Sequence, residues 1–243
     1  MKHSILFLSL LSITSAAFSQ VTLESQPVGT SRDGVLVMYG SSSMGNKRIP
    51  YDKISGSPFW KTEYINAMII DRGNQILGKA PVKLNLYTNE VYFLTPRGEE
   101  RVAAAGKVRK VIFYKDENYK EVLAIFENNV STIIENNPQA ENSSFVQVMN
   151  EGNFQLLKHI KMNFVTADSL FGTMKRYYFS DQSLYYFNVK GQIHRLKKLN
   201  KDNVYELIGN TTGYDAWIKQ NNLNLKKEED LLQFLQHVNE TSK

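Results

Sequence analysis

The pattern of hydrophobic and polar positions divides the chain into a long β-rich stretch and a shorter helical one. Between positions 59 and 199 apolar residues mostly alternate with polar ones, as Val82, Leu84 and Leu86 do with their neighbours. Alternation with a period of two places one side of a strand on a core and the other in water. One more strand is predicted before this stretch, at 35–39. The others are 63–70, 82–86, 90–94, 110–114, 121–126, 130–134, 145–149, 154–165, 176–180, 184–189 and 192–196.

Short polar segments separate these strands. Thr88-Asn89 and Lys190-Gly191 are predicted tight turns, because Asn and Gly tolerate the left-handed backbone region. Asp181-Gln182 is interpreted in the same way, as a turn between two short strands. The Asn-rich segment 135–144 is the best candidate for an internal boundary. It either links two β sub-domains or forms one long hairpin loop.

After position 199 the apolar period becomes helical. Asn200 is a predicted N-cap and Gly209 a predicted C-cap of a first helix, and two more helices are expected at 214–221 and 226–239. In the last one, apolar residues recur at intervals of three and four. Strands followed by helices predict an α+β fold: a largely antiparallel β meander, as a sandwich or partly open barrel, followed by two or three C-terminal helices.

Residues 1–19 have the order of features typical of a secretory signal peptide. A positive start at Lys2 precedes a short apolar run, and Ala17 and Ser19 have the small-x-small spacing of a cleavage site. Cleavage after Ser19 makes Gln20 the first of 224 residues. No later apolar run is long enough for a transmembrane anchor. We therefore expect a protein that is exported to the periplasm or the extracellular space and is soluble after cleavage.

These boundaries predict four regions. They are a signal peptide at 1–19, an irregular N-terminal segment at 20–58, a β-rich body at 59–199 and a C-terminal helical segment at 200–243.

Composition excludes several kinds of site. The chain has no cysteine, which excludes disulfides, thiolate zinc sites and a cysteine nucleophile. Of its 4 histidines, His3 lies in the N-terminal segment that we expect to be removed. No pair among the others, His159, His194 and His237, has helical ligand spacing, and each is interpreted as a surface residue. The glycine loop at 40–45 lacks the Lys and Ser/Thr of a phosphate-binding loop. We therefore assign no catalytic residue, metal site or cofactor, and favour a non-enzymatic role.

Net charge adds little to this picture. The formal charge of +5 falls to +4 when Lys2 leaves with the signal peptide. So small an excess is not the electrostatic pattern of a nucleic-acid-binding protein. We therefore expect no nucleic-acid partner.

Aromatic residues are abundant, with 13 Tyr, 13 Phe and 2 Trp. Most of them occupy strand or helix positions that pack a core, but exposed rings also stack on ligands. The ligand-binding candidates are Trp60, Tyr177 and Tyr186, provided that they are exposed on one flat face. This is the basis of an alternative function as a carbohydrate-binding or carbohydrate-acting protein.

Three segments carry a resemblance: the Tyr-Asp-Lys-Ile-Ser-Gly-Ser-Pro-Phe run at 51–59, the strand at 81–87 and the C-terminal run at 222–231. In these segments the chain resembles uncharacterised exported β-rich proteins of Bacteroidetes. Lys83-Leu84 departs from the Arg-Tyr usual in that family, and the resemblance implies no activity. Asp168-Ser169-Leu170 matches the O-glycosylation pattern of such bacteria, which makes Ser169 a candidate modification site.

The main functional hypothesis is therefore an exported, non-enzymatic protein of the periplasm or cell envelope. It would act by binding or scaffolding, with a glycan or an envelope protein as its partner.

Overall fold

A computed structural model describes residues 25–27, 35–38, 47–50, 53–104, 106–128, 144–168, 175–209 and 211–242. Several predicted features lie outside these residues: the cleavage site at Ser19 and Gln20, the strand 130–134, the modification candidate Ser169, and all of segment 135–144 except Ser144.

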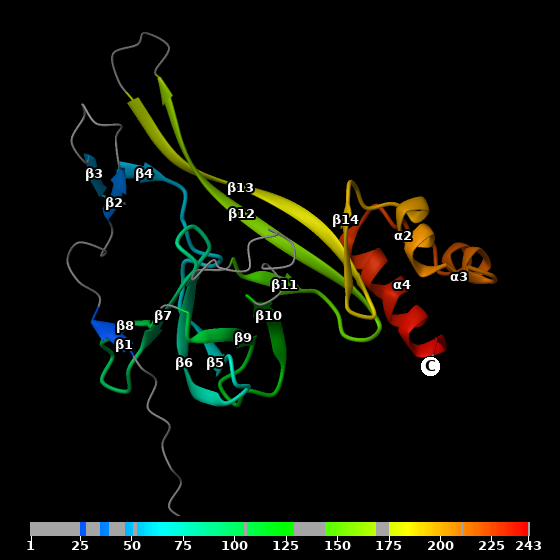
Figure 1. Cartoon of the computed structure of the whole chain (residues 1–243), viewed down its shortest axis with the longest axis horizontal. Helices are drawn as coiled ribbons and strands as arrows, with labels where there is room; N and C mark the ends of the chain where they lie inside the picture. The colour runs from blue at the N-terminus through cyan, green and yellow to red at the C-terminus, as the bar shows by residue number, and fades with distance from the viewer. Residues whose placement is uncertain are drawn as a thin grey trace, which may run out of the picture.

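Twelve of the described strands form one sheet (Figure 1). Along it the order is β1-β8-β7-β6-β5-β9-β10-β11-β12-β13-β14, and β4 pairs with β13 off this path. Every neighbouring pair is antiparallel except β4 with β13. Two meanders, β5 to β8 and β9 to β14, are joined where β5 pairs with β9. A separate two-stranded sheet consists of β2 and β3.

The strands are β1 (Ser25–Pro27), β2 (Val35–Met38), β3 (Lys47–Pro50), β4 (Ile54–Ser55), β5 (Ile65–Asp71), β6 (Ile76–Asn85), β7 (Glu90–Leu94), β8 (Glu100–Ala103), β9 (Val108–Tyr114), β10 (Val122–Glu127), β11 (Val146–Val148), β12 (Phe154–Asp168), β13 (Lys175–Val189) and β14 (Gln192–Leu196). The helices are α2 (Lys201–Ile208), α3 (Tyr214–Gln220) and α4 (Glu228–Thr241). This order confirms the predicted α+β class, with a β meander followed by helices.

The hairpin of β12 and β13 dominates the molecule. It crosses from the β body to the helices, and its tip projects beyond the body (Figure 1). The two strands pair in register along all fifteen residues of each. The predicted turn at Asp181-Gln182 is therefore wrong: these residues pair with Met162 and Lys161 inside one continuous strand. Both side chains are polar and exposed, as residues in turns commonly are, and this explains the wrong prediction.

The two sides of this hairpin differ in what they contact. Side chains alternate along a strand, and antiparallel partners share a side. Even positions of β12 and odd positions of β13 form the side that we call the packed face. Its residues belong to three hydrophobic clusters: Ile160 and Met162 contact the β body, Phe187 contacts the helices, and Phe179 contacts Ile54. The opposite side, which we call the open face, has odd positions of β12 and even positions of β13.

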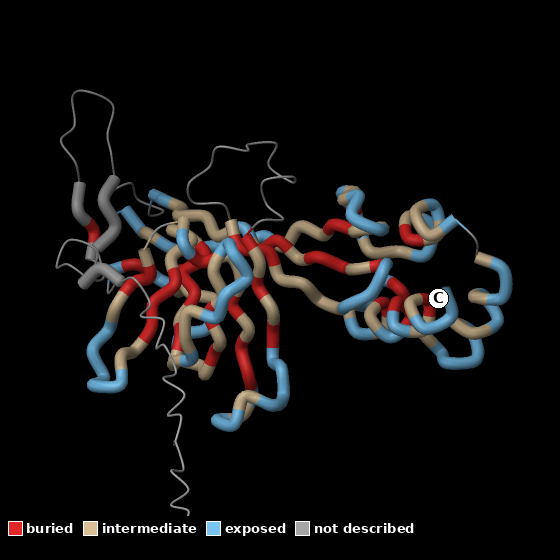
Figure 2. The backbone as a smooth tube through the Cα atoms, turned by 60° about the horizontal axis from the view of Figure 1, so that its bottom comes forward, coloured by how far each residue is buried: buried red, intermediate tan, exposed pale blue. Residues whose placement is uncertain are grey.

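The helices cover one end of the packed face. In α4 the side chains of Leu231, Phe234, Leu235 and Val238 are fully buried. Figure 2 shows buried segments in the β body, along the hairpin and in the helical region. Asn200 caps α2 by accepting a hydrogen bond from the Asn203 amide, and Gly209 ends it, as predicted. In the described part of the chain, no helix is both long and apolar enough to cross a membrane.

A hydrogen-bonded asparagine holds the C-terminal end of α4 on the hairpin. The Asn239 side chain accepts from the Phe154 amide at 2.9 Å and donates to the carbonyls of Phe154 and Glu151 at 2.9 and 3.1 Å. It lies against Gly152, whose φ is +115°, and any Cβ on Gly152 would overlap the Asn239 amide carbon. The turn before β12 therefore needs glycine for both its backbone angle and its space.

An ion pair holds the other end of α4. Glu228 accepts from the Lys158 ammonium at 2.8 Å and from the Tyr185 hydroxyl at 2.6 Å. Burial alone raises the pKa of Glu228, but the hydrogen bonds and the positive charge of Lys158 outweigh it, and the net pKa lies below its ordinary value. Burial, with the contact to Glu228, raises the pKa of Tyr185. The helix thus docks through two polar contacts that flank its apolar stripe.

Candidate functional site

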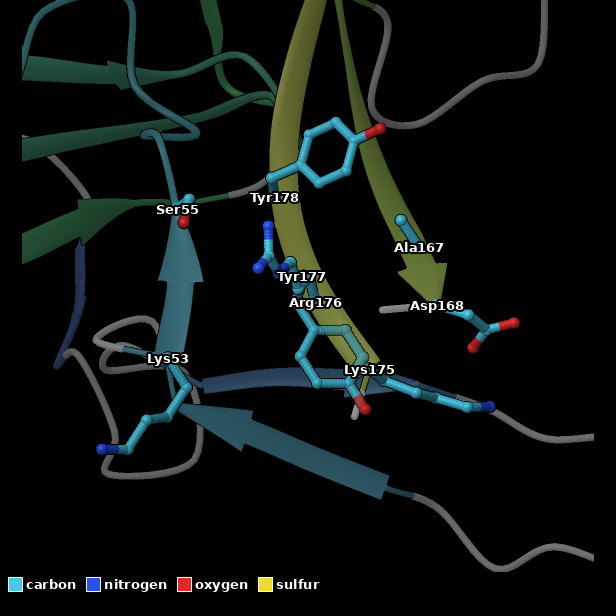
Figure 3. Close-up of a pocket in the computed structure, with 8 residues that line it drawn as sticks. All are labelled: Lys53, Ser55, Ala167, Asp168, Lys175, Arg176, Tyr177 and Tyr178. Atoms are coloured by element: carbon cyan, nitrogen blue, oxygen red, sulfur yellow. The ribbon is translucent and has the colours of Figure 1, made fainter. Parts of the chain in front are cut away.

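The candidate site is a hollow of about 670 Å³ at the tip of the hairpin (Figure 3). It is formed where β4 pairs with the first residues of β13, which pair on their other side with the last residues of β12. The residues that line it are Lys53, Ser55, Ala167, Asp168, Lys175, Arg176, Tyr177 and Tyr178.

A parallel strand from far away in the sequence completes this site. Ile54 pairs with Tyr177 and Ser55 with Tyr178, and the buried Ile54 side chain packs with Phe179. Gly56 follows with φ of +83°, and a Cβ there would lie 3.1 Å from the Phe179 carbonyl oxygen. Glycine lets the chain leave β4 this close to β13.

Strand alternation divides the lining residues between the two sides of the tip. Because Ile54 and Tyr177 are partners on the packed face, Ser55, Arg176 and Tyr178 lie on the open face. Lys53 precedes β4 and also lines the hollow. Tyr177 is half-buried, and its ring stacks on Phe164 with centroids 5.8 Å apart and planes at 12°. Tyr178 is exposed, with 36% of its surface accessible. The tip therefore has one fixed ring and one accessible ring.

The charge of the lining is positive. Three cations, Lys53, Lys175 and Arg176, accompany a single carboxylate, Asp168. In Figure 3 the side chains of Lys175 and Asp168 point away from that of Lys53. Charged side chains that point away from one another do not form an acid–base pair around a bond. Their net positive charge does attract an anionic ligand. The Arg176 guanidinium can bind a carboxylate or phosphate through two hydrogen bonds.

The structure does not bring together the three aromatic residues named as ligand candidates. Trp60 packs in the β body, with ring centroids 4.8 Å from Phe113 and 5.0 Å from Phe126. Tyr186, 8% exposed, belongs to a small cluster on the open face, and only Tyr177 lines the tip hollow. The three residues thus belong to three separate clusters and share no platform.

Sequence reasoning missed Tyr178, Arg176 and Lys53 as site residues. Tyr178 follows Tyr177 directly, and period-two alternation alone shows that the two rings face opposite sides. Which of the two sides is accessible depends on β4, whose pairing with β13 has no local signal in the sequence. Only the three-dimensional structure identifies the exposed ring.

The histidines differ partly from expectation. His159 was expected at the surface, but it is only 6% exposed, and with Lys161 and Tyr186 it lines a smaller hollow of about 360 Å³ beside β12. His237 stacks on Trp217, with ring centroids 4.1 Å apart and planes at 1°. Over the described residues, no group of three or more His, Cys, Asp or Glu side chains is arranged to hold a metal ion.

Comparisons with protein-family models, with curated proteins and with solved structures find no match to this chain.

Proposed function

We propose that this chain is an exported binding or scaffolding protein of the periplasm or cell envelope, and that it contacts its ligand with the hairpin tip. The observation that carries the proposal is the tip hollow, where three cations and an exposed tyrosine surround a cavity of about 670 Å³. The hairpin carries this tip beyond the β body (Figure 1), where a large ligand has access to it. The signal-like N-terminus supports export, and the resemblance to exported proteins of Bacteroidetes agrees with it.

Binding without catalysis fits the geometry of the tip best. Hydrolysis of a glycoside needs two carboxyl groups across the scissile bond, whereas the tip lining contains only Asp168. Carbohydrate binding is the second candidate, because the exposed Tyr178 ring adjoins Arg176 and offers a flat surface for a sugar ring.

Co-sedimentation with envelope material of the producing cell tests this proposal. The purified chain should pellet with the envelope fraction and leave its polymers at unchanged length. Arg176→Gln should lower the bound fraction severalfold, whereas Arg97→Gln, which removes an exposed arginine from a turn of the β body, should leave it unchanged. Failure of the wild-type chain to pellet, or shortening of a polymer, would overturn the proposal.

A further inference from the structure

The open face of the hairpin continues from the tip hollow as a mostly polar strip, in which Val165 and Ala167 are apolar and half-buried. Four rows of the β12–β13 ladder form it, β4 adds Ser55 beside the row of Tyr178, and Lys53 lies just before β4 in the hollow at the tip. The rows are Lys161 with Gln182, Asn163 with Ser180, Val165 with Tyr178, and Ala167 with Arg176. At about 3.4 Å per residue, they span roughly 20 Å.

No side chain of this strip is acidic. Its cations are Lys53, Lys161 and Arg176, all of them exposed. The two acids of this part of the hairpin, Asp168 and Asp181, belong to the packed face. The strip therefore carries cations and no carboxylate among its own side chains, which favours a ligand that carries negative charges.

The strip is also rich in neutral hydrogen-bonding groups. Ser55, Asn163, Ser180 and Gln182 add hydroxyl and amide groups, which both donate and accept hydrogen bonds. Tyr178 lies in the row next to Arg176, so an aromatic surface adjoins the guanidinium. Lys53 and Arg176 lie together at the tip, and Lys161 lies about 20 Å along the strip. These cations, the hydroxyl and amide groups and the one ring match a polymer of hydroxylated rings that carry carboxylates.

We propose that the strip binds an acidic polysaccharide, one whose sugar rings carry carboxylates, in an extended conformation along the hairpin. This inference rests on the proposed function and specifies its ligand class. A nucleic acid fits less well, because surfaces that bind single strands stack successive bases on several rings. Tyr178 is the one exposed ring among the residues of the strip, and it provides a single stacking position.

Calorimetric titration with three polymers of matched length tests the ligand class. The probes are polygalacturonate oligomers, neutral dextran oligomers and single-stranded DNA, each at low and at moderate salt. We expect polygalacturonate to bind more tightly than the other two, and added salt to weaken it. The combined variant Lys53→Gln, Lys161→Gln, Arg176→Gln should lose about tenfold in affinity, because exposed ion pairs are weak individually and add up over three positions.

A variant of equal charge change controls for net charge. Lys107→Gln, Lys120→Gln and Lys226→Gln remove three exposed lysines from the β body and the helical segment, and should leave the affinity unchanged. Circular dichroism melting checks that both variants fold. Equal loss in the control, tighter binding of DNA, or no binding of polygalacturonate would overturn the inference. Continued pelleting with the envelope fraction in that case would show that the ligand class is wrong while the proposed function stands.

Discussion

The packed and open faces of the β12–β13 hairpin differ in what they contact. The packed face contacts the β body, the C-terminal helices and β4, and it contains fully buried side chains such as Leu156 and Phe187. The open face is polar and exposed toward the tip, with Tyr178 as its accessible ring. Toward the helices the open face is covered as well, because Leu157 is fully buried and clusters with Val146 and Tyr186. The half of the open face near the tip is the part that remains available to a ligand. Substitutions on the packed face and on this half of the open face should therefore separate stability from binding.

The largest contrast is expected from truncating one aromatic residue on each face. Phe187 is fully buried and stacks near Phe154, with ring centroids 6.2 Å apart. Phe187→Ala should lower the free energy of unfolding by about 3–5 kcal/mol, through lost burial and a residual cavity. Tyr178→Ala should change it by only about 0.5 kcal/mol, because the ring is partly in solvent. Urea denaturation measures both, and similar losses would refute the division into faces.

Two glycine substitutions sharpen the role of α4 as a support of the packed face. Gly152→Ala imposes a strained backbone and displaces Asn239 from its three hydrogen bonds, so stability should fall by at least about 2 kcal/mol. Gly98 also has a positive φ, +79°, but a Cβ there meets nothing within 4 Å. Gly98→Ala should therefore cost only about 1 kcal/mol. Equal costs in thermal unfolding would show that the Asn239 contact contributes nothing.

Removing the Glu228 carboxylate should have a smaller, pH-dependent effect. Glu228→Gln should lower stability by about 1 kcal/mol at neutral pH, because the pair with Lys158 is partly exposed. The pKa of Glu228 is lowered in the fold, so its contribution is present above the pKa of the unfolded carboxyl and is lost as the pH falls through the folded value. Melting temperatures of the two proteins should therefore converge in acid.

Glu229→Gln is the matched control for that measurement. Glu229 lies in the same first turn of α4 but is exposed. A constant difference between wild type and Glu228→Gln at every pH, or an equal effect of Glu229→Gln, would contradict the ion-pair interpretation.

The smallest stability effect is expected on the open face. Lys161→Gln should change the unfolding free energy by no more than about 0.5 kcal/mol, since the side chain is exposed and packs in none of the three clusters on the packed face. Chemical denaturation measures this. A loss near that of Phe187→Ala would place Lys161 in the structural core.

Local pattern predicted the elements of this fold well. Alternation identified Glu90–Leu94 and Gln192–Leu196 with their bounds, and the Asn200 cap began the first helix as expected. These features depend on neighbours in the sequence. Asp181 and Gln182 were misread because their polarity is local, whereas the ladder that keeps them extended is formed with β12.

The site was harder to predict for the same physical reason. Tyr177 and Tyr178 are adjacent and chemically identical, and their different exposure arises from β4 and from packing on Phe164. Nothing near position 54 indicates a partner near position 177. The acid-free strip depends on the exact register of fifteen paired residues, which a turn assumed at 181–182 would have concealed.

Lysine acetylation footprinting with and without polygalacturonate tests the central claim most directly. Lys53 lines the tip hollow and Lys161 lies on the open face, whereas Lys115 and Lys120 lie in a turn of the β body, and all four are exposed. We expect the ligand to slow acetylation of Lys53 and Lys161 and to leave Lys115 and Lys120 unaffected. Protection of Lys115 and Lys120, with no change at Lys53 and Lys161, would contradict the assignment of the open face as the binding surface.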